Sequence, residues 1–101
     1  MGSSLSSREG LELVSVKNDS AKDVRIQFIH PYKSCHDSLL VEAGSEKSVE
    51  TSEGSFGFVD EEGKSYFPYE RGEIMPKITV DGVTFFITTS RRGVEIHSVD
   101  T

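Results

Sequence analysis

The sequence predicts an all-β protein, an antiparallel β-sandwich of about seven or eight short strands with no substantial helix. Apolar residues alternate with polar ones at a period of two, which is the pattern of a strand with one buried face. Turn-forming residues interrupt this pattern at short, regular intervals, as is typical of a sandwich. No segment shows the apolar spacing that forms one face of a helix.

The N-terminal half contains two instructive strand candidates. Residues 24–28 place Val24, Ile26 and Phe28 on one face, and Pro31 then ends the strand because it has no N–H to donate. An earlier candidate, residues 11–16, changes its period before Val16, which suggests a β-bulge. Further short strands are expected at residues 39–41, 48–52 and 56–59.

The strongest local signal lies near the C-terminus. Asp81-Gly82 separates two apolar segments, residues 78–80 and 83–87, and this dipeptide favours the type I′ turn of a β-hairpin. Residues 94–99 form the last expected strand, and as an edge strand they could pair between two copies of the chain.

Composition limits the class of partner and compartment. The chain has 101 residues, which is one domain, and 11 basic against 17 acidic residues give a net charge of −6. An acidic surface does not neutralise phosphates, so a general nucleic-acid binder is not expected. The single cysteine indicates a reducing compartment, and no apolar run is long enough to cross a membrane. We therefore expect a cytoplasmic protein.

The N-terminus is expected to be separate from the folded domain. Residues 1–7 are small and polar and predict a disordered tail, leaving residues 8–101 as a single sandwich domain. Gly2, with Ser6 four residues later, fits the N-myristoylation pattern, and would make the protein a membrane-tethered adaptor. The alternative is a flexible start without a lipid.

Three residues close in sequence could carry chemistry. His30, Cys35 and His36 offer nitrogen and sulfur ligands that suit Zn²⁺, or a thiol beside an imidazole. Their spacing matches no standard zinc motif, and no fourth ligand is evident. A loop with one buried thiol and two surface imidazoles is the simpler interpretation, so we expect no catalytic residue, metal or cofactor.

Aromatic residues gather in an irregular segment after the fifth expected strand. Tyr66, Phe67 and Tyr69 surround a proline, and Tyr32 lies in an earlier loop. Aromatic side chains near loops are frequent anchors in binding surfaces. They could equally cover the ends of the sandwich core, and the sequence leaves both interpretations open.

Several short motifs, in the same order along the chain, resemble the β-domain of the von Hippel–Lindau tumour suppressor family. The resemblance covers about residues 7–87. Its parts are Ser7-Arg8-Glu9, the turn Asn18-Asp19-Ser20, the turn residue Gly44, the Asp60 to Gly63 turn, and the hairpin motif formed by Pro76, Ile78, Val80, Asp81 and Gly82.

The resemblance implies a sandwich that binds peptides through a pocket for hydroxylated proline. The pocket's first tryptophan corresponds to Phe28, its tyrosine to Ser38, its serine to Thr51, its histidine to Ser55 and its second tryptophan to Gly57. Because two aromatic walls become serine and glycine, the pocket is expected to be degenerate. The family's helical domain, which binds elongin C, has no counterpart, so elongin C is not an expected partner.

These observations together predict a non-enzymatic module that binds a protein or an extended peptide. Addition of a peptide strand to a sheet uses main-chain hydrogen bonds and needs few special residues.

Overall fold

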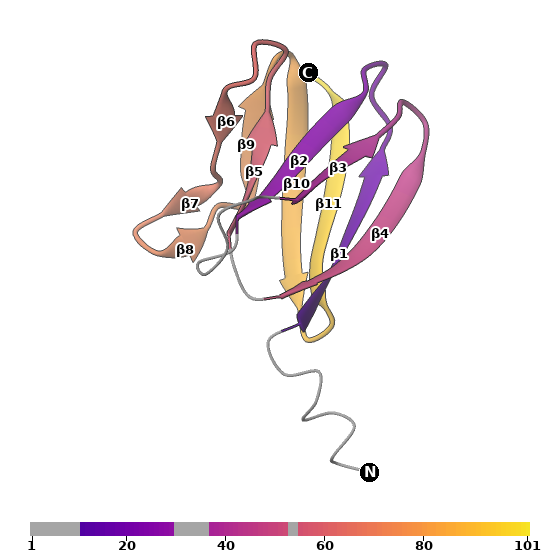
Figure 1. Ribbon diagram of the computed structural model, residues 1–101. Helices are drawn as coiled ribbons and strands as arrows, with labels where there is room; N and C mark the ends of the chain where they lie inside the picture. Colours follow the sequence, from indigo (N-terminus) through magenta and orange to yellow (C-terminus); the bar gives the residue numbers. More distant parts are fainter. Residues whose placement is uncertain (1–10, 30–36, 53–54) are drawn as a thin grey trace.

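The computed structural model describes residues 11–29, 37–52 and 55–101, and every regular element in these residues is a β-strand (Figure 1). The predicted all-β class is confirmed, but the described residues form more strands than the seven or eight expected. The additional strands are short pieces of two residues in the aromatic segment. The strands are β1 (Leu11–Asn18), β2 (Val24–Ile29), β3 (Asp37–Val41), β4 (Glu46–Ser52), β5 (Ser55–Val59), β6 (Ser65–Tyr66), β7 (Tyr69–Glu70), β8 (Glu73–Ile74), β9 (Lys77–Val80), β10 (Val83–Ser90) and β11 (Gly93–Asp100).

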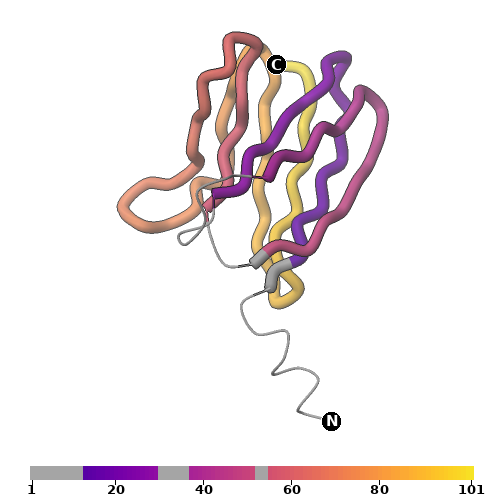
Figure 2. The backbone as a smooth tube through the Cα atoms, viewed as in Figure 1, coloured from indigo at the N-terminus to yellow at the C-terminus, as the bar shows by residue number. Residues whose placement is uncertain are grey.

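The strands form two principal sheets. A five-stranded sheet has the order β4-β1-β11-β10-β9, and a four-stranded sheet has the order β3-β2-β5-β6. The chain moves back and forth between them, because β1 and β4 belong to the first sheet and β2, β3, β5 and β6 to the second (Figure 2). The small β7–β8 hairpin extends from one side (Figure 1).

The pairing of β1 with β11 corrects the expectation of an antiparallel sandwich. These two strands run parallel, in a register from Leu13 opposite Gly93 to Asn18 opposite Ser98. The other strand pairs within the described residues are antiparallel. β11 therefore lies inside the sheet between β1 and β10, and it cannot be the free edge strand that the sequence suggested.

The core lies between the facing sides of the two sheets. Phe58 of β5 is fully buried, and its ring stacks on that of Phe85 of β10 with 4.0 Å between centroids. Valine and isoleucine from both sheets surround this pair. Stacked rings together with β-branched side chains fill the space between two twisted sheets well.

The first strand differs from its prediction. Val14 and Val16 point into the core, whereas Leu13 points outward and is 37% exposed. The register with β4 is continuous from Leu11 to Lys17, so this pairing contains no bulge. The sequence pattern misled because an apolar residue, Leu13, occupies an outward position.

The predicted hairpin turn at Asp81-Gly82 is confirmed. Asp81 has φ 52° and Gly82 has φ 77°, the positive values that a type I′ turn requires at both central positions. β9 and β10 pair directly on either side of it, with Val80 opposite Val83.

Candidate functional site

The five residues expected to form a peptide pocket do not share one surface. Phe28 points into the core between the sheets and is only 5% exposed. Thr51 belongs to β4, in the five-stranded sheet, opposite Glu12. Ser38, Ser55 and Gly57 belong to the four-stranded sheet. The structure therefore does not bring Phe28 and Thr51 to the surface that the other three share.

That shared surface is the outer face of the four-stranded sheet. Ser38 of β3 and Gly57 of β5 both pair with Gln27 of β2, one on each side of it. Ser55 pairs with Ile29, two residues further along β2 on the same face. By standard sheet spacings, the Cα atoms of Ser38 and Ser55 are about 12 Å apart. This separation is too large for both hydroxyls to bind one hydroxyproline ring.

The space beside Gly57 is filled by the protein's own chain. A Cβ atom added to Gly57 would lie 2.7 Å from the ring of Phe67. The Phe67 ring therefore occupies the position in which a side chain at Gly57 would lie. Phe67 itself is 42% exposed, so it presents an aromatic surface where the family's second tryptophan was expected.

The outer face has an apolar side chain at each of its two sides. Leu40 on β3 is 41% exposed and Phe67 lies beyond β5. Between them the surface is polar, and the hydroxyl of Ser65 donates a 2.7 Å hydrogen bond to Oε1 of Gln27. This arrangement offers two apolar contacts separated by polar groups, a surface suited to a partner rather than to catalysis.

Strand β3 forms an edge of the four-stranded sheet, because β2 is its neighbour on one side and no described strand pairs with the other. The Nζ atom of Lys47, from β4, donates to the carbonyl oxygen of Leu40 at 2.7 Å. The ammonium group comes from outside the sheet, which indicates that Leu40 directs its main-chain groups away from β2. The N–H and C=O groups of successive residues point alternately to the two sides of a strand. The main-chain groups of Ser38, two residues before Leu40, therefore also point away from β2.

A depression of about 640 Å³ lies at one end of the sandwich, between the β1–β2 turn, the end of β5 and the β9–β10 hairpin. Charged side chains surround it, but several of them serve the turns. Asp81 accepts the N–H of Glu61 at 2.9 Å, and Asp23 accepts the N–H of Ala43 at 3.0 Å. The acidic groups at this end therefore stabilise loops.

Asp60 shows how strongly one of these turns is held. Its Oδ1 accepts the N–H groups of Lys64 at 2.8 Å and Glu62 at 2.9 Å, and its Oδ2 accepts the hydroxyl of Tyr66 at 3.0 Å. These bonds, with that from Lys64 the largest, lower the pKa of the Asp60 carboxyl below its ordinary value of 3.8. The same hydroxyl bond raises the pKa of Tyr66 above 10.0.

The lowered pKa of Asp60 predicts an acid-sensitive contribution to stability. A carboxyl whose pKa is lower in the folded state stabilises fully above its unfolded pKa, and this contribution is lost as the pH falls through the folded value. We expect Asp60→Asn to reduce the fall in urea midpoint between about pH 5 and about pH 2.5. An unchanged acid dependence in the variant would show that other carboxyls account for it.

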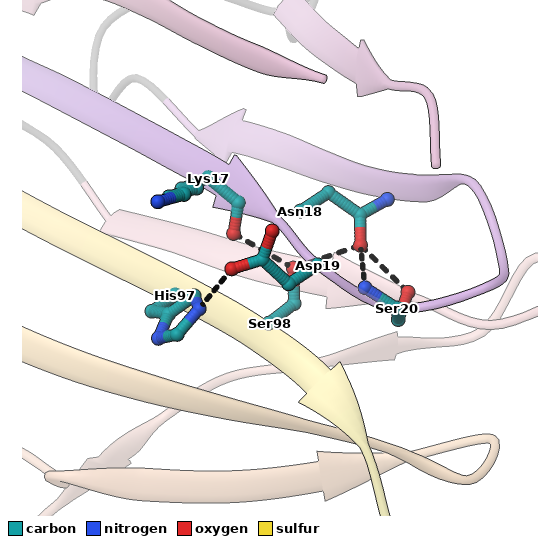
Figure 3. A network of polar contacts seen from close by, with 6 residues as sticks. All are labelled: Lys17, Asn18, Asp19, Ser20, His97 and Ser98. Atoms are coloured by element: carbon teal, nitrogen blue, oxygen red, sulfur yellow. Dashed lines mark hydrogen bonds and ion pairs between the residues drawn. The ribbon is translucent and has the colours of Figure 1, made fainter. Parts of the chain in front are cut away.

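A polar network connects the start and the end of the chain (Figure 3). Asn18 and Ser98 are fully buried, and Asn18 Oδ1 accepts the N–H of Ser20 at 3.0 Å and the hydroxyl of Ser98 at 3.3 Å. Beside it, Nε2 of His97 lies 2.6 Å from Oδ2 of Asp19 (Figure 3). The sequence predicts the Asn18–Ser20 turn, but it does not indicate the contact of His97 with Asp19, because these residues are 78 positions apart.

The remaining candidates lie outside the described residues: His30, Cys35 and His36, the predicted tail of residues 1–7, and Gly2. The alternatives of zinc binding and of myristoylation therefore stay untested. Within the described part of the chain, no three His, Cys, Asp or Glu side chains are grouped to hold a metal ion. The same residues contain no helix long and apolar enough to cross a membrane.

Fold and surface together define the class, an all-β protein of two packed sheets with a partly apolar sheet face next to an edge strand, β3, whose outer side no described strand covers. Comparison with protein-family models, with curated proteins and with solved structures finds no match for this chain. The resemblance to the von Hippel–Lindau family thus stays an inference from the motifs.

Proposed function

We propose that this protein is a non-enzymatic peptide-binding module that takes an extended segment of a partner protein beside β3. The observation that carries the proposal is the edge of β3, which no described strand covers on its outer side, with the exposed side chain of Leu40 on it. An added strand would displace the Lys47 ammonium from the carbonyl oxygen of Leu40. An added strand satisfies its own main-chain groups against such an edge, and specificity then comes from alternate side chains.

The edge strands β3 and β4 differ in a way that favours β3. The edge strand β4 carries Glu46, Lys47 and Glu50, and charged residues on an edge discourage pairing with another strand. β3 carries serine, leucine and valine, with Asp37 at its beginning as its one charged residue. The apolar character of β3 supports strand addition at this edge.

The geometry also indicates the chemistry of the partner segment. Side chains of an added strand that point to the outer face would lie next to Ser38 and Leu40, which favours an aliphatic residue beside Leu40. Asp37 begins β3 and Glu42 follows its end, and the whole chain carries a net charge of −6. Basic residues flanking the aliphatic position therefore complement this edge.

The resemblance to the von Hippel–Lindau family adds hydroxyproline as a candidate residue within the bound segment. Ser38 is the hydroxyl nearest to the proposed strand, because it lies on β3 itself. Ser55 lies two strands away, so a hydroxylated ring beside Ser38 would be held by one serine hydroxyl instead of a complete pocket. We expect hydroxylation to change affinity only slightly.

A matched pair of leucine variants tests the proposal. Random short peptides are selected on the wild-type protein, and the affinity of the selected peptides is measured for wild type, Leu40→Lys and Leu13→Lys. Leu13 is 37% exposed, against 41% for Leu40, but it lies on β1, which has a neighbour on both sides. We expect Leu40→Lys to weaken binding at least about tenfold and Leu13→Lys to leave it unchanged.

The position of the bound peptide is checked by nuclear magnetic resonance. Peptide binding at the proposed edge shifts the amide signals of β3 and protects them from hydrogen exchange. Failure to select any peptide, equal losses in the two lysine variants, or amide shifts confined to the five-stranded sheet would each contradict the proposal.

A further inference from the structure

One row of exposed side chains crosses the outer face of the five-stranded sheet from edge to edge. Strand register joins its neighbours directly, since Lys17 lies opposite both Glu46 and His97, and Phe86 lies opposite both His97 and Lys77. From β4 to β9 the row is Glu46, Lys17, His97, Phe86 and Lys77. Each of these residues is exposed, including Phe86 at 43%.

The row contains a hollow beside an aromatic ring. A shallow depression of about 370 Å³ extends over Glu46, Lys17, His97 and Phe86. The Nζ atom of Lys77 lies 6.0 Å from the ring centroid of Phe86, so the ring already accepts a cation on one side. An exposed phenylalanine among charged residues is a common centre of a protein interface.

We infer that this face is the interface between two copies of the chain, related by a two-fold axis parallel to β11. Such an axis places β4 against β9 of the second copy, β1 against β10, and β11 against itself. The row of one copy then lies opposite the same row of the second copy, which runs in the reverse order. Glu46 faces Lys77 of the second copy, and Lys17 faces the ring of Phe86.

The two outer kinds of contact within the row are favourable, and each occurs twice because the axis repeats it. The central contact occurs once. The Glu46 and Lys77 pairs are ion pairs, and the Lys17 and Phe86 pairs are cation–π contacts. On the axis, His97 meets its copy, and two imidazole rings can stack there. A random row of five charged, aromatic and polar residues would not match its own reverse, so charge complementarity indicates a second copy of this chain as the occupant.

The available area suits a weak dimer. The five strands have four to eight residues each, and at a spacing of about 4.8 Å and a rise of about 3.3 Å per residue they give a face on the order of 550 Å² per copy. Stable interfaces bury about 800 Å² on each partner. We therefore expect association at high concentration rather than a permanent dimer.

The same symmetry brings one unfavourable pair together. Glu95 precedes His97 by two residues on β11, and it faces Glu95 of the second copy across the axis. Like charges opposite each other weaken an interface. Removing this charge by Glu95→Gln should therefore strengthen the dimer, which is an effect that surface disruption in general would not produce.

Sedimentation equilibrium of the full chain, up to millimolar concentration, tests the inference through a charge exchange. Glu46→Lys and Lys77→Glu should each weaken dimerisation about tenfold or more, and the double variant Glu46→Lys/Lys77→Glu should restore it. The control Glu62→Lys, in the exposed turn after β5, makes the same change of charge as Glu46→Lys away from the row and should have no effect.

Three results would overturn the inference: a wild-type protein that stays monomeric, single reversals that leave the dimer unchanged, or a double variant as weak as either single one. Circular dichroism of each variant separates loss of dimer from loss of fold. The dimer leaves β3 uncovered, since β3 belongs to the other sheet, so peptide binding and dimerisation succeed or fail independently.

Discussion

Replacing Asn18 by leucine is expected to destabilise the protein by about 3–5 kcal/mol, the range for breaking a buried polar network. The side chain is fully buried, and its Nδ2 donates to the carbonyl oxygens of Lys22 at 2.7 Å and Val41 at 3.0 Å. Leucine has a similar volume but no polar atoms. Two carbonyls and the N–H of Ser20 would lose their partner in a dry environment.

The effect should be large because Asn18 joins three parts of the fold. It connects the β1–β2 turn with the end of β3. Through the Ser98 hydroxyl it also connects them with strand β11 (Figure 3). Urea unfolding measures the change. Ser98→Ala removes two long bonds, from the hydroxyl to Asn18 Oδ1 at 3.3 Å and to the Lys17 carbonyl oxygen at 3.4 Å, and should reduce the free energy of unfolding by only about 1 kcal/mol. A loss below about 1 kcal/mol for Asn18→Leu would show that the network contributes little.

Replacing Gly93 by alanine should be comparably damaging, because it blocks the parallel pairing of β1 with β11. A Cβ atom at Gly93 would lie 2.1 Å from the carbonyl oxygen of Leu13 and 2.8 Å from its nitrogen. These are main-chain atoms of the neighbouring strand, which a side-chain rotation cannot move away. Gly93 also has φ 142°, a value that strains any residue with a side chain.

Gly44→Ala provides the matched control for this prediction. Gly44 also has a positive φ, of 78°, but a Cβ atom added to it would meet nothing within 4 Å. Gly44→Ala should lower the free energy of unfolding by about 1 kcal/mol, because only backbone strain contributes. We expect Gly93→Ala to lower the free energy of unfolding, measured with urea, by at least about 3 kcal/mol. Equal losses in the two variants would show that β1 and β11 can separate without penalty.

Much of the local structure follows from short-range rules. Alternation at Val24, Ile26 and Phe28 predicts both the strand β2 and the buried face of it. The Asp81-Gly82 dipeptide predicts its hairpin because few residues accept positive φ at two consecutive positions. These features depend on sterics within a few residues, which is why they can be read from the sequence.

The candidate site was less predictable because it depends on which residues share a face. Phe28 and Ser38 were assigned to one pocket, yet Phe28 points into the core and Ser38 points to solvent. Adjacent positions on a strand face opposite sides, so an alignment of motifs does not show which surface a residue reaches unless its strand register is known. The position of the Phe67 ring over Gly57 follows only from the path of the chain after β6.

Sequence patterns are enough to predict the all-β class, the strand periodicity, the hairpin at Asp81-Gly82 and the turn at Asn18 to Ser20. The folded chain is needed to see that β1 pairs in parallel with β11, that β3 lies at an edge of the described sheet, and that one row is formed by Glu46, Lys17, His97, Phe86 and Lys77. The physical reason is the range of the interactions. Turns and strand alternation arise from neighbouring residues, whereas strand order arises from burying two whole sheet faces against each other.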